Sequence, residues 1–280
     1  MIRFVVTSDE AGRIDRIVQR RYPYASRRTL ARYFADGNVR VDGAVARKGT
    51  CVAAGAVIDL RAPPPAPDDL RPVADGGAPL AVLYADADLV AVAKPAGMPS
   101  HPLAAGETGT VANALVARFP DCAGVGDDPR EAGLIHRLDT GTTGVLVAAR
   151  SAAAWRRLRA AMTDGRARKH YLALVAGAAR DGEASSPIRG QPAHTAWSVV
   201  RRVGEWTLLA CTPTTGRMHQ IRIHLSRAGH PIVGDVRYGG PPAGLVGHFL
   251  HAARLVLPGR PPIEAPMPCD RAALLAAADR

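Results

Sequence analysis

The chain has 280 residues, a formal net charge of +11 and 47% hydrophobic residues. This apolar content is enough for a folded core and excludes global disorder. No apolar run reaches the length of a membrane span, because arginine, aspartate or glycine interrupts every one. The first residues lack the apolar region of a signal peptide, and the 4 cysteines lie far apart without a Cys-x-x-Cys motif, which argues against a zinc ribbon or a disulfide scaffold. We therefore expect a cytoplasmic protein with no membrane partner.

The positive charge is dispersed along the chain and is not confined to a tail. A basic protein of this kind often binds a polyanion, so the charge favours a nucleic-acid partner. A compositional bias towards alanine, arginine, glycine and proline would also raise the arginine content without any function. The charge by itself leaves this simpler explanation open.

Residues 12–60 predict a compact N-terminal unit. One helix is expected to end before Pro23, and a second is expected to follow the N-cap residue Ser26. The segment after the second helix predicts a β-hairpin that turns at Asp42 and Gly43. Many arginines and few acids lie in this unit. A solvated helix face would explain some of them, but so many cations would repel one another without a counter-charge.

This unit resembles the alpha-L RNA-binding domain, a small domain named after a ribosomal small-subunit protein. The shared pattern is Arg13-x-Asp15, Ser26-Arg27, Gly37-x-Val39-x-Val41-Asp42-Gly43, Lys48 and Gly55-x-x-Ile58. Asp42 stands where the pattern usually has asparagine, and Ala56 stands where it usually has aspartate. The resemblance implies RNA contacts from Arg13, Arg27, Arg28, Arg40 and Lys48.

A proline-rich segment, residues 62–79, follows the N-terminal unit. Proline removes backbone donors and stiffens the chain, so this segment predicts a semi-extended spacer. The predicted organisation is therefore an RNA-binding domain at 1–61, a spacer at 62–79 and a catalytic domain at 80–280.

The second domain begins with two predicted strands, residues 80–84 and 89–93, on either side of an acidic turn. A rigid proline-rich loop then carries Lys94, and a short helix is expected at 110–119. Ser151 is the expected N-cap of an arginine-rich helix, and three later segments have the composition of strands. Helices and strands mix without strict βαβ alternation, which predicts an α+β fold with a largely antiparallel mixed sheet.

The stretch 133–150 combines chemical groups with a buried strand. His136, Arg137 and Asp139 precede the apolar run 145–148, and the glycines between them permit a sharp bend. A carboxylate at the start of a buried strand, with a cation two residues before it, is consistent with a catalytic group. It also suits a turn residue that bonds its own backbone two residues on. Local spacing leaves both interpretations open.

A second stretch, residues 214–239, interleaves polar and apolar side chains. If its central part is helical, His219 and Arg222 share a face because they are three residues apart. His219 and His224 are five residues apart, whereas zinc-binding helices usually place their ligands four apart. We therefore predict no bound metal.

Together these stretches resemble the RluA-type pseudouridine synthase family over about residues 80–268. Its motifs occur in the family's order as KPAGMPSHP (94–102), HRLDTGTTG (136–144), KHYLALVAG (169–177), GRMHQIRIHL (216–225) with GHPIVGD and YG after it, and FLHAARLVLP (249–258). The resemblance implies an isomerase that converts uridines of structured RNA, ribosomal or transfer, to pseudouridine. This reaction has no redox step, and the chain lacks a glycine-rich dinucleotide fingerprint, so no cofactor is expected.

The family resemblance also implies roles for single residues. Asp139 is the implied catalytic carboxylate and Arg222 its ion-pair partner, while Tyr171 would stack beneath the uracil. Arg137 would occupy the space left when the target base is extruded from the RNA. Whether Asp139 attacks the ribose or abstracts a proton stays open. The other residues expected to bind substrate are His136, Lys94, Arg217, His219, Gln220, Ile221 and Leu225.

Two other functions compete with this interpretation. One is a catalytically silent RNA-binding or RNA-chaperone protein of the same fold, against which the intact Asp139, Arg222 and Tyr171 argue. The other is a metal-dependent hydrolase built on His136, Asp139 and His219, which metal analysis of the pure protein would distinguish, since a synthase should contain no stoichiometric metal. RNA is the expected partner and the protein is expected to be a monomer, whereas the target uridine is not determined.

Overall fold

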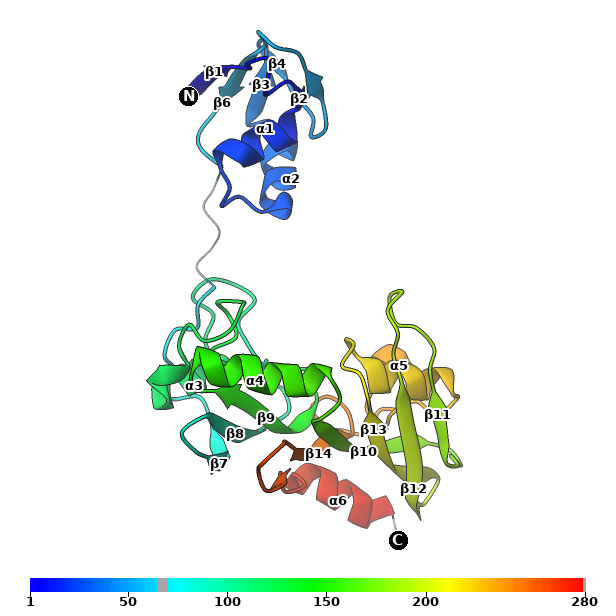
Figure 1. The fold of residues 1–280 in the computed structure, drawn as a ribbon. Coiled ribbons are helices and arrows are strands. Elements are labelled where there is room, and N and C mark those ends of the chain that lie inside the picture. The colour runs from blue at the N-terminus through cyan, green and yellow to red at the C-terminus, as the bar shows by residue number, and fades with distance from the viewer. Residues whose placement is uncertain (65–69, 279–280) are drawn as a thin grey trace. The chain divides into compact units, whose positions relative to one another are not determined.

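The computed structural model describes residues 1–64 and 70–278. Part of the predicted spacer, residues 65–69, and the side chain of Arg28, a predicted RNA contact, lie outside the described part of the chain. The chain forms two compact units, Met1–Asp69 and Leu70–Arg280, and each has its own hydrophobic core (Figure 1).

The N-terminal unit packs two helices against a small antiparallel sheet. Its elements are β1 (Ile2–Val5), β2 (Gly12–Arg13), α1 (Ile14–Arg21), α2 (Arg27–Ala35), β3 (Val39–Val41), β4 (Ala44–Val45), β5 (Cys51–Val52) and β6 (Val57–Leu60). The sheet order is β1-β6-β3-β4, and β2 pairs with β5. As predicted, Ser26 caps α2 by accepting a hydrogen bond from the backbone N–H of Thr29 at 3.0 Å. The predicted hairpin joins β3 to β4, with φ of 48° at Asp42 and 82° at Gly43.

The second unit is built on one nine-stranded sheet. Its elements are β7 (Ala81–Ala85), β8 (Leu89–Lys94), α3 (Val111–Arg118), η1 (Pro120–Cys122), β9 (Thr143–Ala149), α4 (Ala152–Thr163), β10 (Arg168–Ala176), β11 (Gly182–Ala184), β12 (Thr195–Val203), β13 (Trp206–Pro213), α5 (Gln220–Arg227), η2 (Val236–Tyr238), β14 (Leu250–Val256), β15 (Ile263–Glu264) and α6 (Cys269–Ala278). The order is β11-β12-β13-β10-β14-β9-β8-β7, with β15 beside β14. Among the described strands only β9 and β14 pair in parallel. The predicted α+β fold with a largely antiparallel sheet is confirmed.

Strand β9 lies within this sheet, between β14 and β8, and all seven of its residues are buried. Because side chains alternate along a strand, its two faces belong to two cores. Val145 and Val147 pack with Trp155 of α4, while Leu146 packs with Leu115 of α3. The predicted apolar run is therefore covered on both sides, as its lack of polar residues requires.

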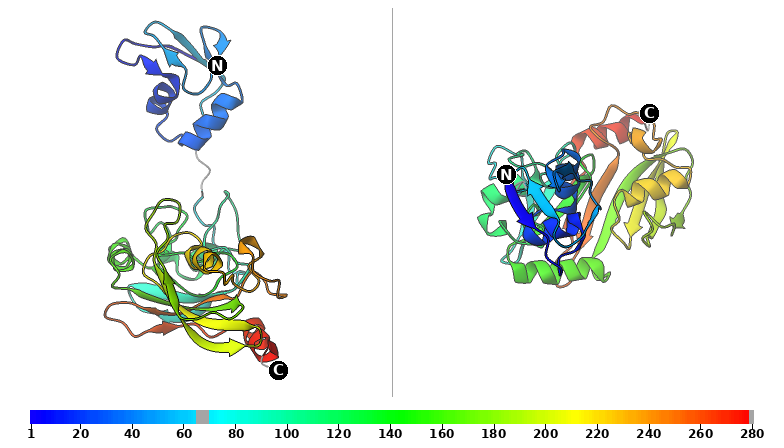
Figure 2. Two further views of the ribbon diagram at one scale, coloured as in Figure 1. Left: turned by 90° about the vertical axis from the view of Figure 1, so that its right-hand side faces the viewer. Right: turned by 90° about the horizontal axis from the view of Figure 1, so that it is seen from above.

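The other half of the sheet carries α5 and α6. Figure 1 and the left-hand view of Figure 2 show these two helices on opposite sides of β12 and β13. Ile221 and Leu225 of α5 pack into the same core as Leu209 of β13. This packing fixes the helix that carries the second predicted motif.

Part of the predicted spacer contacts the second unit. The carboxylate of Asp75 accepts a hydrogen bond from the backbone N–H of Gly109 at 3.0 Å, and the Asn113 amide donates to the carbonyl of Val73 at 2.7 Å. Asn113 also completes a capping box with Thr110 at the start of α3. The contacts therefore place the segment around Val73 and Asp75 with the second unit.

None of the helices in the described ranges has both the length and the hydropathy that crossing a bilayer requires.

Strands β9 and β14 approach each other closely at Gly144. A Cβ atom at Gly144 would lie 2.2 Å from the Ala252 carbonyl oxygen, and its φ of 117° is unfavourable for other residues. We predict that Gly144→Ala lowers the free energy of unfolding by about 3 kcal/mol or more, from overpacking and backbone strain together. Urea unfolding measures this.

The matched control is Gly165→Ala. Gly165 also has a positive φ, 81°, but no atom lies within 4 Å of the added Cβ. This variant should lose only the strain, about 1–2 kcal/mol. Equal losses in the two variants would show that the close approach to Ala252 has no cost of its own.

Candidate active site

The loop that carries Asp139 lies between two anchored backbone segments. Ile135 donates its N–H to the Val147 carbonyl at 3.0 Å, and Thr142 donates its N–H to the Asp139 carbonyl at 2.9 Å. The backbone of Asp139 thus closes the turn, while its carboxylate pairs with Arg222. Of the two interpretations that the sequence left open, the geometry favours a carboxylate available for chemistry.

The KPAGMPSHP loop holds both sides of Asp139. Ser100 donates its hydroxyl to the Leu138 carbonyl at 2.8 Å, and Lys94 donates to the Thr140 carbonyl at 3.0 Å. The ammonium of Lys94 also donates to the carbonyls of Pro95 and Met98, and its side chain is only 2% exposed. The predicted substrate contact of Lys94 is therefore corrected: the side chain is buried beneath the loop and its donors serve backbone carbonyls.

The turn after Asp139 packs against the chain before β14. A Cβ at Gly141 would lie 2.9 Å from the Cα of Gly247. Thr142 and His248 form a buried hydrogen bond of 2.8 Å across this contact. Arg271 of α6, fully buried, donates to the carbonyls of Gly141 and His248 at 3.2 and 2.8 Å. Elements distant in sequence thus fix the turn.

Arg222 of α5 lies between two carboxylates. Its Nη1 donates to Oδ2 of Asp139 at 2.8 Å, while Nε and Nη2 donate to the two oxygens of Asp235 at 2.6 and 2.9 Å. Burial opposes the charge, but the hydrogen bonds to Asp235 and Asp139 outweigh it and raise the pKa of Arg222. The predicted pair between Asp139 and Arg222 is present in the geometry, and a second carboxylate orients the guanidinium.

His219 and Tyr238 lie beside this pair. The Nε2 atom of His219 is 3.7 Å from Oδ1 of Asp139, and its Nδ1 is 2.8 Å from the Tyr238 hydroxyl. His219 has a left-handed backbone, with φ of 57°, where α5 begins. The ring of Tyr238 contacts the Arg222 guanidinium at 4.9 Å.

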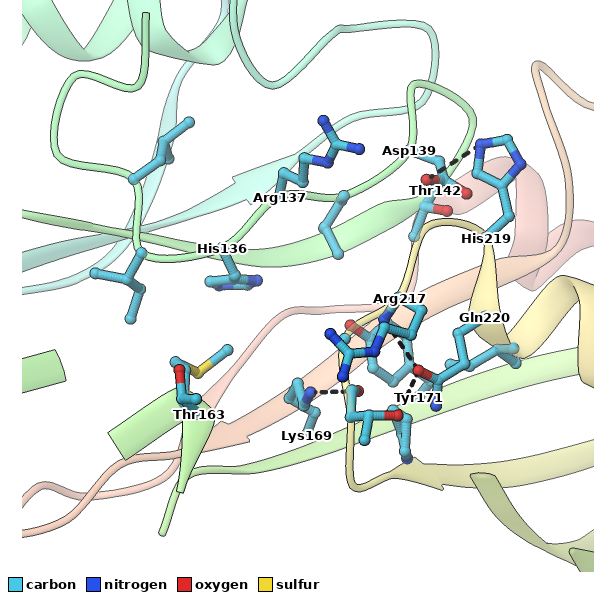
Figure 3. Close-up of a pocket in the computed structure, with 18 of the residues that line it drawn as sticks. His136, Arg137, Asp139, Thr142, Thr163, Lys169, Tyr171, Arg217, His219 and Gln220 are labelled. Carbon is cyan, nitrogen blue, oxygen red and sulfur yellow. Dashed lines mark hydrogen bonds and ion pairs between the residues drawn. The ribbon is translucent and has the colours of Figure 1, made fainter. Parts of the chain in front are cut away.

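Asp139, His219 and Arg222 line a pocket of about 510 Å³, and Figure 3 shows Asp139 and His219 among its lining residues. Tyr171 of β10 lines it, and burial together with the charge of Asp139 raises the pKa of its hydroxyl, which therefore stays protonated. Of the predicted substrate contacts, those that line the pocket are His136, Arg137, Arg217, His219, Gln220 and Ile221. Leu225 is instead fully buried in the core beneath α5, because it lies one helical turn beyond Ile221.

Two of the lining residues are tied into the protein framework. Gln220 accepts from the hydroxyl of Thr215 at 2.6 Å and donates to the carbonyl of His194 at 2.8 Å, so it braces the loop before α5. His136 accepts from the Val147 N–H at 3.3 Å. Burial, with nearby cations, lowers the pKa of His136 to about 3, so the ring is neutral.

The pocket contains a cation that the sequence reasoning missed. Lys169, only 8% exposed, donates to the Thr215 carbonyl at 2.8 Å, and no carboxylate of the described chain forms an ion pair with it. Burial lowers its pKa to about 8. Strand alternation offered a signal, since Lys169 precedes Tyr171 by two residues and shares its face of β10.

The motif segments GHPIVGD and YG contain Asp235 and Tyr238, which the sequence did not predict as site residues. Both follow the segment Ile232–Val233, in a turn where the chain gives no helical or strand periodicity. The Gly-Asp and Tyr-Gly pairs around them were the available signal. His136 lines the pocket away from Asp139 and His219 (Figure 3), and no three His, Cys, Asp or Glu side chains among the described residues gather as a metal site.

Four of the predicted RNA contacts of the N-terminal unit, Arg13, Arg27, Arg40 and Lys48, are exposed. Arg13 pairs with Asp15 at 2.9 Å, and Lys48 donates to the backbone carbonyl of Arg27 at 3.4 Å. Arg40 lies on the hairpin and donates to the carbonyl of Gly43 at 2.9 Å.

Comparison with known proteins identifies the family of this chain. Residues 88–227 match the family model described as RNA pseudouridylate synthase. An uncharacterized RNA pseudouridine synthase of Chloroflexus aurantiacus is 40% identical over 288 aligned positions, covering 95% of this chain and 90% of the relative. The ribosomal large subunit pseudouridine synthase D of Nitrosomonas europaea is 35% identical, covering 99% of this chain and 87% of the relative.

A solved structure shows the same fold. Human RNA Pseudouridylate Synthase Domain Containing 4 aligns with a TM-score of 0.59 and 23% identity, covering 71% of this chain and 92% of that one. The chain belongs to the RNA pseudouridylate synthase family, and within it to the RluA type. It is an isomerase that forms pseudouridine in RNA.

Lys169 should reduce the stability of the protein. Its pKa falls from 10.5 to about 8 on folding, so between these values the unfolded chain binds more protons and stability rises with pH. At pH 7 the buried charge carries its full cost. We predict that Lys169→Met raises the melting temperature at pH 7 by a few degrees and removes the rise in stability between pH 8 and 10.

The same variant should modify RNA more slowly, since the pocket loses a cation. Lys48→Met, at an exposed position, is the control and should leave the melting curve unchanged. A lower melting temperature for Lys169→Met would mean that the bond to Thr215 stabilises the fold by more than burial of the charge costs.

Proposed function

We propose that this enzyme converts uridines of structured RNA, ribosomal RNA in particular, to pseudouridine, with Asp139 as the reacting carboxylate. The observation that carries the proposal is the pair in the pocket, where Arg222 holds Oδ2 of Asp139 at 2.8 Å. The guanidinium supplies the counter-charge that a carboxylate needs in a partly closed site. Oδ1 is not held by Arg222 and is the oxygen available for reaction.

The reaction needs one ionised carboxylate and a bound uracil. The bond from N1 to the ribose breaks with its electron pair leaving on the uracil, the base turns, and C5 bonds to the ribose. C5 then loses a proton and N1 gains one, so the atoms balance without a redox step. Asp139 can begin this sequence either by attacking the ribose carbon or by removing a ribose proton. Both routes use the same free oxygen.

The groups around Asp139 fit an extruded uridine. Tyr171 offers a protonated aromatic side chain on the pocket wall, suited to stacking beneath the base. Arg137 is exposed beside Asp139 and lines the same pocket (Figure 3), so its guanidinium can fill the gap in the RNA stack. Ile221 supplies apolar surface from α5.

Ribosomal RNA is favoured as the substrate by the name of the Nitrosomonas europaea relative, a large-subunit enzyme whose alignment covers 99% of this chain. The exposed cations Arg13, Arg27 and Lys48 suit binding to the phosphates of that RNA. A catalytically silent RNA-binding protein of this fold would have no use for a buried, doubly held arginine beside a free carboxylate oxygen. The active enzyme is therefore the function that we propose.

Asp139→Asn should abolish pseudouridine formation, because a carboxamide keeps the shape but neither attacks nor abstracts. Tritium release from RNA labelled at C5 of uridine should fall by at least about a thousandfold, in the range lost when an essential catalytic group is removed. Binding of the same RNA, measured by filter retention, should change little. Asp127→Asn, at an exposed position, is the control. Substantial turnover by Asp139→Asn would remove Asp139 from the role proposed.

The N-terminal unit should supply affinity but no chemistry, because its core is separate and the pocket lies entirely in the second unit. A chain starting at Leu70, which keeps the contacts of Val73 and Asp75, should bind RNA more weakly with a shallower dependence on salt. Each lost phosphate contact should reduce the slope of log affinity against log salt by about 0.7–0.9. The shortened chain should still modify RNA at high enzyme concentration.

The full chain with Arg13, Arg27 and Lys48 all changed to alanine is the matched variant, since it loses the cations and keeps the unit. It should reproduce the shallower slope. A shortened chain that is folded yet inactive at saturating RNA would show that the N-terminal unit also shapes the active site.

A further inference from the structure

One short segment, residues 235–238, touches both neighbours of the Asp139 carboxylate. Asp235 holds the guanidinium of Arg222 through two hydrogen bonds. Tyr238 contacts Arg222 with its ring and His219 with its hydroxyl. The segment therefore holds the groups beside both oxygens of Asp139, whose own polar partners are Arg222 and His219.

The segment is held firmly in place. Ser226 of α5 donates its hydroxyl to the Tyr238 carbonyl at 2.7 Å, and Gly240 donates its N–H to the Asp235 carbonyl at 2.9 Å. A Cβ at Gly240 would lie 1.8 Å from the carbonyl oxygen of Ile232, so this turn requires glycine. The position of the Tyr238 hydroxyl is thus set by backbone contacts to α5 and to the preceding turn.

The neighbours of His219 decide which of its nitrogens carries the proton. Nε2 faces Oδ1 of Asp139 at 3.7 Å, and a nitrogen lone pair would be repelled by a carboxylate there. The favoured tautomer carries its proton on Nε2. Nδ1 then accepts a hydrogen bond, and the Tyr238 hydroxyl at 2.8 Å is the donor.

We propose that Tyr238 is a positioning residue, whose hydroxyl fixes His219 as a neutral imidazole with its Nε2–H directed towards the free oxygen of Asp139. This inference rests on the proposed role of Asp139. Arg222 orients one carboxylate oxygen, and His219 presents a donor beside the other. At 3.7 Å that donor is too far for a hydrogen bond, so Oδ1 stays free to react while its direction is constrained.

The hydroxyl has a second effect on His219. An imidazolium would pair with Asp139 and occupy the reacting oxygen. Protonation needs the lone pair on Nδ1, and that lone pair already accepts the hydrogen bond from the Tyr238 hydroxyl. The charged groups facing His219 are Asp139 and Asp235, which favour its charge, and Arg222 and Arg237, which oppose it. Burial is the largest influence and lowers the pKa of His219, in the same direction as the bond from Tyr238.

Tyr238→Phe tests the proposal, because it removes only the hydroxyl and keeps the ring on Arg222. We expect kcat at pH 7 to fall about tenfold, as the loss of one hydrogen bond allows, with KM unchanged within about twofold. The acid limb of the kcat profile should move to higher pH, since Nδ1 becomes free to accept a proton. Tyr84→Phe, which loses a hydroxyl bonded to Asp86 far from the pocket, is the control and should leave both unchanged.

His219→Asn separates the proposed chain of contacts from a general effect. Asparagine tolerates the left-handed backbone and can still accept from Tyr238, but it has no donor at the position of Nε2. This variant should lose as much rate as Tyr238→Phe, and the double variant should be no slower than either one. Rate losses that multiply in the double variant would overturn the proposal.

Nitrogen-15 spectra of the imidazoles give a readout independent of turnover, with His219 assigned by its absence in His219→Asn. Wild-type His219 should be protonated on Nε2 alone at pH 7, and its pKa should rise in Tyr238→Phe. An unchanged pKa together with wild-type kcat in Tyr238→Phe would refute the inference. Activity in Asp139→Asn would instead refute the proposed function and leave the spectral result standing.

Discussion

The site depends on the hydrogen bonds by which the guanidinium of Arg222 joins two carboxylates. Asp139 lies 83 residues before it and Asp235 lies 13 residues after it, and one side chain joins them. Burying such charges is costly, and a buried ion pair is often no more stabilising than an apolar contact would be. Its value here lies in geometry, since three fixed donors leave the guanidinium with one orientation and the Asp139 carboxylate with one free oxygen.

The rest of the second unit holds the two ends of this contact. Lys94 and Ser100 fix the backbone on either side of Asp139, and Arg271 fixes the turn that follows. On the other side of the contact, Leu225 packs α5 against β13, and this packing fixes the position of Arg222 on the helix. The site is therefore assembled from a loop, a helix and a turn that meet only because the sheet is complete.

The two units place their charged groups differently. The N-terminal unit has its own core and exposes cations such as Arg13 and Lys48, whereas the second unit holds Asp139, Lys169 and Arg222 in the lining of a pocket. Exposed cations suit a flexible polyanion that must be bound and released. Partly buried charges suit a reaction, because the protein holds them in fixed positions and their interactions are stronger than those of charges in water.

The sequence by itself determined the local structure and the identity of the central groups. The apolar run of β9, the Ser151 cap of α4 and the turn at Asp42 and Gly43 follow from periodicity and turn chemistry, which act over a few residues. Motif resemblance identified the family and paired Asp139 with Arg222 as an expectation. The division near residue 70 lies within the predicted spacer, but proline content does not reveal which backbone groups of that spacer find partners.

Only the tertiary structure decided the remaining assignments. Asp235 and Tyr238 became site residues because a turn after Val233 returns to α5, and no local pattern encodes that return. Lys94 and Leu225 lost their predicted substrate contacts for the converse reason: burial depends on what other segments cover. The sequence gives the chemical type of each side chain, but whether that side chain faces a pocket or a core depends on contacts between residues far apart in the chain.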